Sequence, residues 1–203
     1  MARRSGNKKL KKEILIFCEG ETEKLYFEML NRKYNASNVK INNTIQVSPF
    51  VAPGQSLDLV EYVIRSIQKN PRYKKNDVEK IYVVFDKDDQ DWERVDMAIR
   101  LAKSNGFGVI FSNICFDIWL LMHYEDVNIA LERKTIYSKL SNSMSIENYE
   151  KNKANSIIKD ILYTKVKVAH DRSQKCCDWS CMRSNPFTNI AEEIKNIYGT
   201  QKL

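Results

Sequence analysis

The stretch ILIFCEGETE, residues 14–23, decides the fold, and KIYVVFDKDD, residues 80–89, repeats its pattern. In each stretch a continuous apolar run ends and carboxylates follow at once. The acids that matter most are Glu19, Glu23, Asp86 and Asp88. A continuous apolar run is typical of a strand that is covered on both faces of a sheet. Because the carboxyl ends of parallel strands open into the ligand crevice of an α/β fold, the two stretches predict an acidic site at that edge.

The predicted acidic site favours a divalent metal ion. Carboxylates that gather in one place repel one another unless a cation lies between them, and hard oxygen ligands suit Mg²⁺ or Mn²⁺. The D-x-D spacing lets Asp86 and Asp88 point the same way from an extended segment, and Glu23 lies one helical turn beyond Glu19. We predict that all four bind metal and that Glu19, Asp86 and Asp88 carry catalysis. The alternative is that they are solvated caps at strand and helix ends.

The apolar pattern of the whole chain predicts an α/β fold with a mainly parallel, four-stranded sheet flanked by helices. Strands are expected over residues 14–18, 44–50, 80–85 and 107–111, with helical periodicity between them. Strands that alternate with helices imply right-handed crossovers. Residues 115–124 are apolar enough for a buried helix, and only helices are expected after them. The expected organisation is a basic flexible arm over 1–13, an α/β core over 14–125, and a helical C-terminal extension over 126–203 packed on the core.

Charge is distributed unevenly along the chain. The formal net charge is +7, and the N-terminal arm supplies six basic residues of it. Inside the body, residues 77–96 carry eight acids against three bases, whereas residues 151–175 carry seven bases against two acids. An acidic centre beside a basic flank suits a metal-dependent enzyme that acts on a polyanion. Two solvated faces of opposite sign are the alternative interpretation.

Composition also indicates where the chain works. No apolar stretch approaches the roughly 18 residues that span a bilayer, so no membrane partner is expected. The N-terminus lacks the apolar core of a signal peptide, and the five cysteines have no disulfide-framework spacing. We therefore expect a cytoplasmic protein. His170 with Cys176, Cys177 and Cys181 has no familiar zinc-ligand spacing, so ordinary thiols are expected there.

Two further features of the acidic stretches resemble a known domain. A strand that ends in Glu-Gly and a later strand that ends in Asp-x-Asp are similar to the hallmarks of the Toprim domain of topoisomerases, bacterial primases and OLD-family nucleases. Residues 14–112 carry this resemblance, and the E-G-x-x-E form of residues 19–23 looks most like the nuclease branches. The resemblance implies proton transfer or metal binding for Glu19, and metal binding for Glu23, Asp86 and Asp88.

A second resemblance covers nearly the whole chain. Residues 112–123 read SNICFDIWLLMH and residues 185–188 read NPFT, and with EGETE these motifs look like the RloB family. Here Ile114 replaces the usual Pro and Asp117 replaces the usual Glu. The resemblance implies a Toprim nuclease-like factor of prokaryotic phage defence, often encoded beside an ATPase partner. Some similar defence Toprim proteins cut tRNA.

The motifs contribute further candidates, each with a structural alternative. Asp117 lies among apolar residues, where it either binds metal or forms a salt bridge. His123 either contacts phosphate or is a hydrogen-bonded core residue. The remaining candidate substrate contacts are Lys134, Lys151, Asn185 and Thr188. Solvated lysines are the alternative for the first two, and an N-cap followed by Pro at the first position of a last helix is the alternative for residues 185–188.

Two functional hypotheses of different classes follow. The first is a nuclease that depends on Mg²⁺ or Mn²⁺ and cleaves phosphodiester bonds of RNA rather than DNA, with tRNA as a candidate, as an antiphage, abortive-infection effector. The second is a non-catalytic sensor or scaffold with the Toprim fold, held by a defence ATPase. The sequence leaves the oligomeric state open, a homodimer included.

Overall fold

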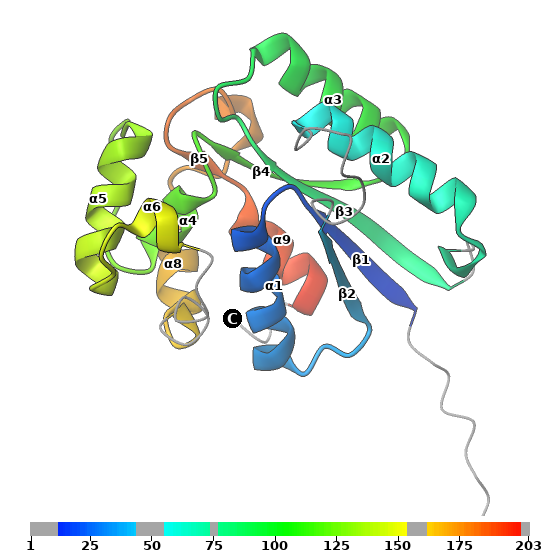
Figure 1. Cartoon of the computed structure of the whole chain (residues 1–203), viewed down its shortest axis with the longest axis horizontal. Helices are drawn as coiled ribbons and strands as arrows, with labels where there is room; N and C mark the ends of the chain where they lie inside the picture. Colours follow the sequence, from blue (N-terminus) through cyan, green and yellow to red (C-terminus); the bar gives the residue numbers. More distant parts are fainter. Residues whose placement is uncertain (1–11, 44–54, 74–76, 154–161, 200–203) are drawn as a thin grey trace, which may run out of the picture.

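The computed structural model describes residues 12–43, 55–73, 77–153 and 162–199 (Figure 1). Its centre is a five-stranded sheet in the order β2-β1-β3-β4-β5. The strands are β1 (Glu13–Cys18), β2 (Val39–Asn43), β3 (Val78–Asp86), β4 (Gly108–Asn113) and β5 (Phe187–Thr188). The first four pair in parallel, whereas β5 pairs with β4 in the antiparallel sense. The predicted α/β class with a mainly parallel sheet is therefore confirmed.

The strand count differs from the prediction of four. The expected strands at 14–18, 80–85 and 107–111 correspond to β1, β3 and β4. The expected strand at 44–50 falls outside the described residues, and the second strand that the structure describes is β2 at Val39–Asn43. The fifth strand, β5, was missed because two residues cannot display a strand's alternating pattern. Its register is set by the pairs Ser112–Thr188 and Asn113–Phe187.

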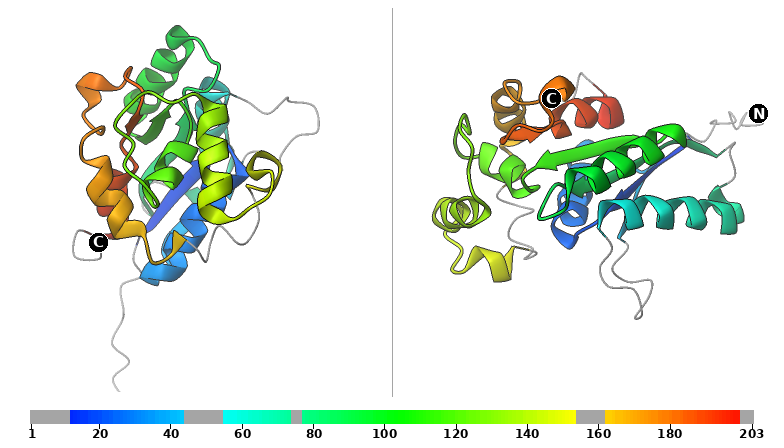
Figure 2. Two further views of the ribbon diagram at one scale, coloured as in Figure 1. Left: turned by 90° about the vertical axis from the view of Figure 1, so that its left-hand side faces the viewer. Right: turned by 90° about the horizontal axis from the view of Figure 1, so that it is seen from above.

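Helices cover both faces of the sheet. On one face, α2 (Ser56–Lys69) and α3 (Trp92–Ser104) lie side by side over a core that includes Leu15 and Phe17 of β1. On the other face, α1 (Glu21–Tyr34) and α9 (Ile190–Tyr198) cover the alternate residues Ile14 and Ile16 (Figures 1 and 2). Strand β1 is buried on both faces, which explains its uninterrupted apolar sequence.

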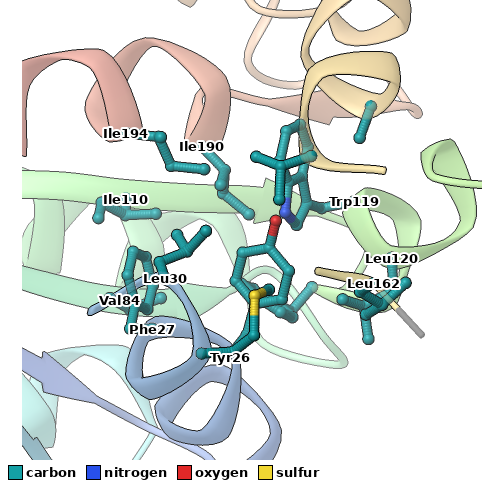
Figure 3. Packing of buried hydrophobic residues seen from close by; sticks show 14 of the residues in the cluster. Tyr26, Phe27, Leu30, Val84, Ile110, Trp119, Leu120, Leu162, Ile190 and Ile194 are labelled. Atoms are coloured by element: carbon teal, nitrogen blue, oxygen red, sulfur yellow. The ribbon is translucent and has the colours of Figure 1, made fainter. Parts of the chain in front are cut away.

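The segment after β4 forms short helices that pack on the α1 face. They are α4 (Asp117–Met122), α5 (Arg133–Met144), α6 (Tyr149–Asn152) and α8 (Val166–Ser173). The structure also has two 3₁₀ turns, η2 (Pro71–Tyr73) between α2 and β3 and η3 (Trp179–Cys181) between α8 and β5. Every residue of α4 is buried, as its apolar sequence predicted. Figure 3 shows Trp119 of α4 beside Tyr26 of α1, with ring centroids 6.2 Å apart. No helix among the described residues is long and apolar enough to span a membrane.

The last helix begins later than the sequence indicated. An N-cap at Asn185 with Pro186 at the first helical position was the expected alternative, yet α9 begins at Ile190 and Asn189 precedes it. Asn189 is fully buried, and its side-chain amide forms two hydrogen bonds with the backbone of β4. Its Oδ1 accepts from the Phe111 N–H at 2.8 Å, and its Nδ2 donates to the Val109 carbonyl at 2.7 Å. This one side chain completes the sheet edge beyond the two-residue strand β5.

We predict that Asn189→Ala lowers the free energy of unfolding by about 2–4 kcal/mol, because two buried backbone groups of β4 lose their partners. Urea unfolding followed by circular dichroism measures this. Asn196→Ala is the matched control, since Asn196 is exposed and its side chain bonds the neighbouring Glu193 of α9, and it should change stability by less than about 0.5 kcal/mol. Equal effects of the two substitutions would contradict the claim that the Asn189 amide stabilises the edge of β4.

Candidate functional site

The acids of the two sequence stretches meet at one edge of the sheet. Strands β1 and β3 are parallel neighbours in which Cys18 pairs with Val84. The Glu19 N–H extends this ladder by donating to the Val84 carbonyl at 3.0 Å. Glu19 and Asp86 therefore leave the carboxyl ends of adjacent strands, and the backbone of Asp86 hydrogen-bonds the Glu19 carboxylate. The structure therefore brings acids of the two separate stretches to the ends of adjacent strands, whereas the predicted four-carboxylate metal site stays a prediction.

Glu23 joins this group because a glycine lets it fold back. Helix α1 begins at Glu21, directly after Gly20, and the Glu23 side chain is 7% exposed. A Cβ atom at position 20 would collide with Oε2 of Glu23. Any residue larger than glycine would displace the Glu23 carboxylate from the end of β1. This close approach is the physical reason for the E-G-x-x-E spacing, in which glycine precedes the helix and Glu follows three residues later.

Burial raises the pKa of each acid at this edge, and the acids raise one another's. The pKa of Glu19 rises to about 8, through burial first and then through Glu23 and Asp88. The pKa of Glu23 rises to about 7, chiefly through burial. Burial, Glu23 and Asp88 raise the pKa of Asp86 well above its usual value. Carboxyl groups whose pKa is raised by burial and by neighbouring acids occur at functional sites more often than elsewhere.

Three buried carboxylate oxygens of this cluster have no hydrogen-bond donor among the described residues: Oε2 of Glu19, Oε2 of Glu23 and Oδ1 of Asp86. Buried acceptors without donors are rare in folded proteins, and they need an explanation. Hard anionic oxygens are the ligands of Mg²⁺ and Mn²⁺, so the residues fit such a cation. No three His, Cys, Asp or Glu side chains of the described residues stand ready as a ligand set, so binding requires these carboxylates to rotate toward one another.

Asp88 occupies a strained position and pairs with a cation that the sequence did not reveal. Its φ of 43° is left-handed, and its N–H donates to the Ile114 carbonyl at 2.9 Å. Arg133, at the start of α5, places Nη2 2.8 Å from Asp88 Oδ1 and Nη1 3.2 Å from Asp89 Oδ2. Burial raises the pKa of Asp88, and Arg133 and Lys153 partly offset this. No motif spacing could have identified Arg133, because it lies far along the chain from its partners.

Asp117 adopts the salt-bridge arrangement that was one of its two alternatives. The hydroxyl of Tyr149 donates to Asp117 Oδ1 at 2.6 Å, and Lys153 Nζ lies 3.2 Å from Oδ2. Both carboxylate oxygens of Asp117 are therefore engaged, and the side chain is fully buried. Lys153 also offsets part of the rise in the pKa of Glu23 that burial causes. The motif thus brings a lysine to the acidic edge, and Lys153 is a second residue that the sequence patterns missed.

His123 lies in the core as a hydrogen-bonded residue. Its Nε2 is 3.0 Å from the Tyr26 hydroxyl and its Nδ1 is 2.9 Å from the Trp119 carbonyl, so both ring nitrogens have partners. Burial lowers its pKa to about 3, which keeps the ring neutral. Nδ1 then donates to the carbonyl and Nε2 accepts from tyrosine. The side chain is 1% exposed, and this geometry matches the structural alternative for His123 rather than a phosphate contact.

The other candidate substrate contacts are scattered. Thr188 is fully buried, with Oγ1 3.1 Å from Ser112 Oγ, and Asn185 donates to the Leu131 carbonyl at 2.9 Å. Lys134 on α5 and Lys151 on α6 are exposed, as solvated lysines would be. Ser112 is the ladder partner of both Asp86 and Thr188, so Thr188 lies two strands away from Asp86. The thiols of Cys176, Cys177 and Cys181 are free, and they form no metal-ligand group with other described residues.

Comparison with known proteins places the chain in a family. The model of the RloB-like protein family matches residues 14–197, so the chain belongs to the RloB-like family. No curated protein matches the chain. Among solved structures, the C-terminal region of the Burkholderia pseudomallei OLD protein aligns over 92% of this chain and 98% of its own length, with 11% sequence identity and a TM-score of 0.39.

The raised pKa values predict that stability depends on pH. The pKa values of Glu19 and Glu23 rise from 4.5 to about 8 and about 7, so the stability linked to their neutral forms is complete below pH 4.5 and is lost as pH rises through 7 and 8. In buffer with EDTA, we predict that Glu23→Gln raises the free energy of unfolding at pH 8 by about 1–3 kcal/mol and flattens its decline above pH 4.5.

The matched control is Glu150→Gln on α6, an exposed acid that should leave the curve unchanged. Urea unfolding at a series of pH values measures both variants. A Glu23→Gln variant that follows the wild-type curve throughout would show that Glu23 is not electrostatically strained.

Proposed function

We propose that this protein is a nuclease that requires Mg²⁺ or Mn²⁺, cleaves phosphodiester bonds of RNA, tRNA among them, and acts in antiphage defence. The observation that carries the proposal is the set of three buried, donor-less carboxylate oxygens from Glu19, Glu23 and Asp86 at adjacent strand ends. The Toprim resemblance of the same residues supports it. The RloB-like family membership supports the defence setting, in which an ATPase is the partner protein.

Glu19, Glu23, Asp86 and Asp88 would hold the cation. When bound, the cation supplies positive charge for the phosphate. Glu19 is also the candidate for proton transfer, because without a cation beside it a pKa of about 8 lets its carboxyl exchange protons near neutral pH. In that role it would take the proton from an attacking oxygen or deliver one to the leaving oxygen.

Arg133 and Lys153 give the acidic edge a cationic rim. Arg133 forms ion pairs with Asp88 and Asp89, and Lys153 forms an ion pair with Asp117. A site built of carboxylates alone would repel a phosphate backbone. Arg133 and Lys153, which are already held by ion pairs with Asp88 and Asp117, reduce this repulsion without requiring the substrate to order flexible side chains. The rim therefore supports a phosphodiester as the ligand.

The second candidate function is a non-catalytic scaffold or sensor for the ATPase. The observation that favours it is that Arg133 and Lys153 already pair with Asp88 and Asp117, while no three acids stand preassembled as ligands among the described residues. An abortive-infection effector is expected to be toxic to a cell in which its expression is induced. Under this alternative, that toxicity would survive replacement of all four predicted ligands by amides. Under the nuclease proposal, the same replacement abolishes toxicity and RNA cleavage together.

We predict that the purified protein cleaves tRNA with Mg²⁺ or Mn²⁺ and not with EDTA, and that Asp86→Asn reduces the rate by at least about a hundredfold. Gel electrophoresis of labelled tRNA measures this. Asp91→Asn is the matched control, because Asp91 is an exposed acid just beyond the same loop, and it should cleave at the wild-type rate. Undiminished cleavage by Asp86→Asn would refute the assignment.

A further inference from the structure

A concave site adjoins β1, the strand that ends at the acidic edge. It is a cavity of about 570 Å³ between α2 and the β1–β2 side of the sheet. The strands contribute Phe17 and Asn42 to its lining, which are direct partners in the parallel ladder. Phe17 stands two residues before Glu19, and Lys24, which also lines the cavity, directly follows Glu23. The cavity and the acidic edge therefore share β1 and the first turn of α1.

The charge of the cavity is opposite to that of the acidic edge. Among the described residues that line it, Lys24, Arg65 and Lys69 are basic and none is acidic. Lys69 takes part in no ion pair with another described residue. The Arg65–Glu61 pair, at 3.4 Å, is solvent-exposed, with 58% of the arginine side chain accessible. Exposed pairs of this kind contribute little, so an incoming phosphate can replace the glutamate at small cost.

The same cavity offers flat rings and an unsatisfied donor. Tyr62 and Tyr73 line it and are half-buried, and the Tyr73 ring is held edge-on against Phe17 at 6.5 Å between centroids. Nδ2 of Asn42 is buried and has no hydrogen-bond acceptor among the described residues. Proteins bind single-stranded nucleic acid with phosphate-binding cations and aromatic faces, and an amide donor such as Asn42 Nδ2 can add a hydrogen bond to a base.

We propose that this cavity binds a single-stranded segment of nucleic acid next to the bond held at the acidic edge. Arg65 and Lys69 contact phosphates, a base stacks on Tyr62, and Asn42 donates to the base. A cavity of about 570 Å³ has room for a nucleotide and is too small to enclose a duplex. The inference rests on the proposed function for its substrate class. It adds to that function a preference for unpaired strands and a residue set that the chemistry does not use.

The first test measures binding without cleavage. A fluorescein-labelled oligoadenylate of about twelve nucleotides is titrated with the full chain in EDTA, and anisotropy gives Kd. Arg65→Ala with Lys69→Ala should weaken binding about tenfold and reduce the slope of log Kd against log salt by about 1.4, the value for two lost phosphate contacts. Arg100→Ala with Lys167→Ala removes the same charges from exposed helix positions elsewhere and should leave Kd and slope unchanged.

The second test separates stacking from charge. Tyr62→Ala should weaken binding of the same probe by about tenfold, whereas Tyr62→Phe, which keeps the ring, should bind as the wild type does. A self-complementary RNA hairpin of the same length, offered as the competitor, should displace the probe poorly. Equal loss in the Ala and Phe variants, or equal competition by the hairpin, would overturn the stacking site.

The binding tests can fail independently of the nuclease assignment. If the wild type binds the oligoadenylate and the Arg65/Lys69 variant does not, the cavity is supported whether or not tRNA is cut. If the wild type cuts tRNA and the Arg65/Lys69 variant cuts it with unchanged KM and kcat, the cavity proposal is overturned while the nuclease stands. Where both hold, the variant shows a raised KM with kcat preserved, because these side chains lie apart from the acids.

Discussion

The structure depends on the parallel pairing of β1 with β3. This pairing brings the ends of two buried strands together, and the residues that follow them are acidic on both. Glu19 continues the β1 ladder onto Val84, so its backbone is fixed at the end of β1 beside the strand that ends in Asp86. Burial makes ionisation of these acids costly, and their proximity makes it costlier. A fold that maintains such an arrangement retains it at the expense of stability, which is the usual sign of a functional site.

The C-terminal half of the chain completes the site that the N-terminal half begins. The Lys87 and Asp88 N–H groups donate to the carbonyls of Ser112 and Ile114. These hydrogen bonds join the loop after β3 to the end of β4 and the residue that follows it. Arg133 and Lys153 then approach from α5 and from the end of α6. One apolar cluster joins residues of α1 with residues of α4, α5, α8 and α9. Core and extension thus share a hydrophobic interior, and the cations at the acidic edge are positioned by that packing.

The parts that were predictable from sequence are those with local signals. Strands β1, β3 and β4 have continuous apolar runs, and the acids directly follow two of them. The parts that were not predictable depend on long-range contacts. Strand β5 exists because Asn189 and Thr188 bond to β4, and Arg133 pairs with Asp88 across the fold. A sequence motif also does not reveal the direction of its side chains. His123 points into the core toward Tyr26, and Asp117 points toward Tyr149, although the motif alone was equally compatible with both contacting a ligand.

The most direct test of the central claim is a Mn²⁺ titration followed by electron paramagnetic resonance, which counts free and bound ions without any substrate. The account predicts saturable binding to the wild type that Asp86→Asn and Glu19→Gln each remove, with Asp91→Asn binding normally. Binding of Mn²⁺ to Asp86→Asn with the wild-type affinity, or no binding to the wild type, would contradict the claim that acids from the two strand ends together hold a cation.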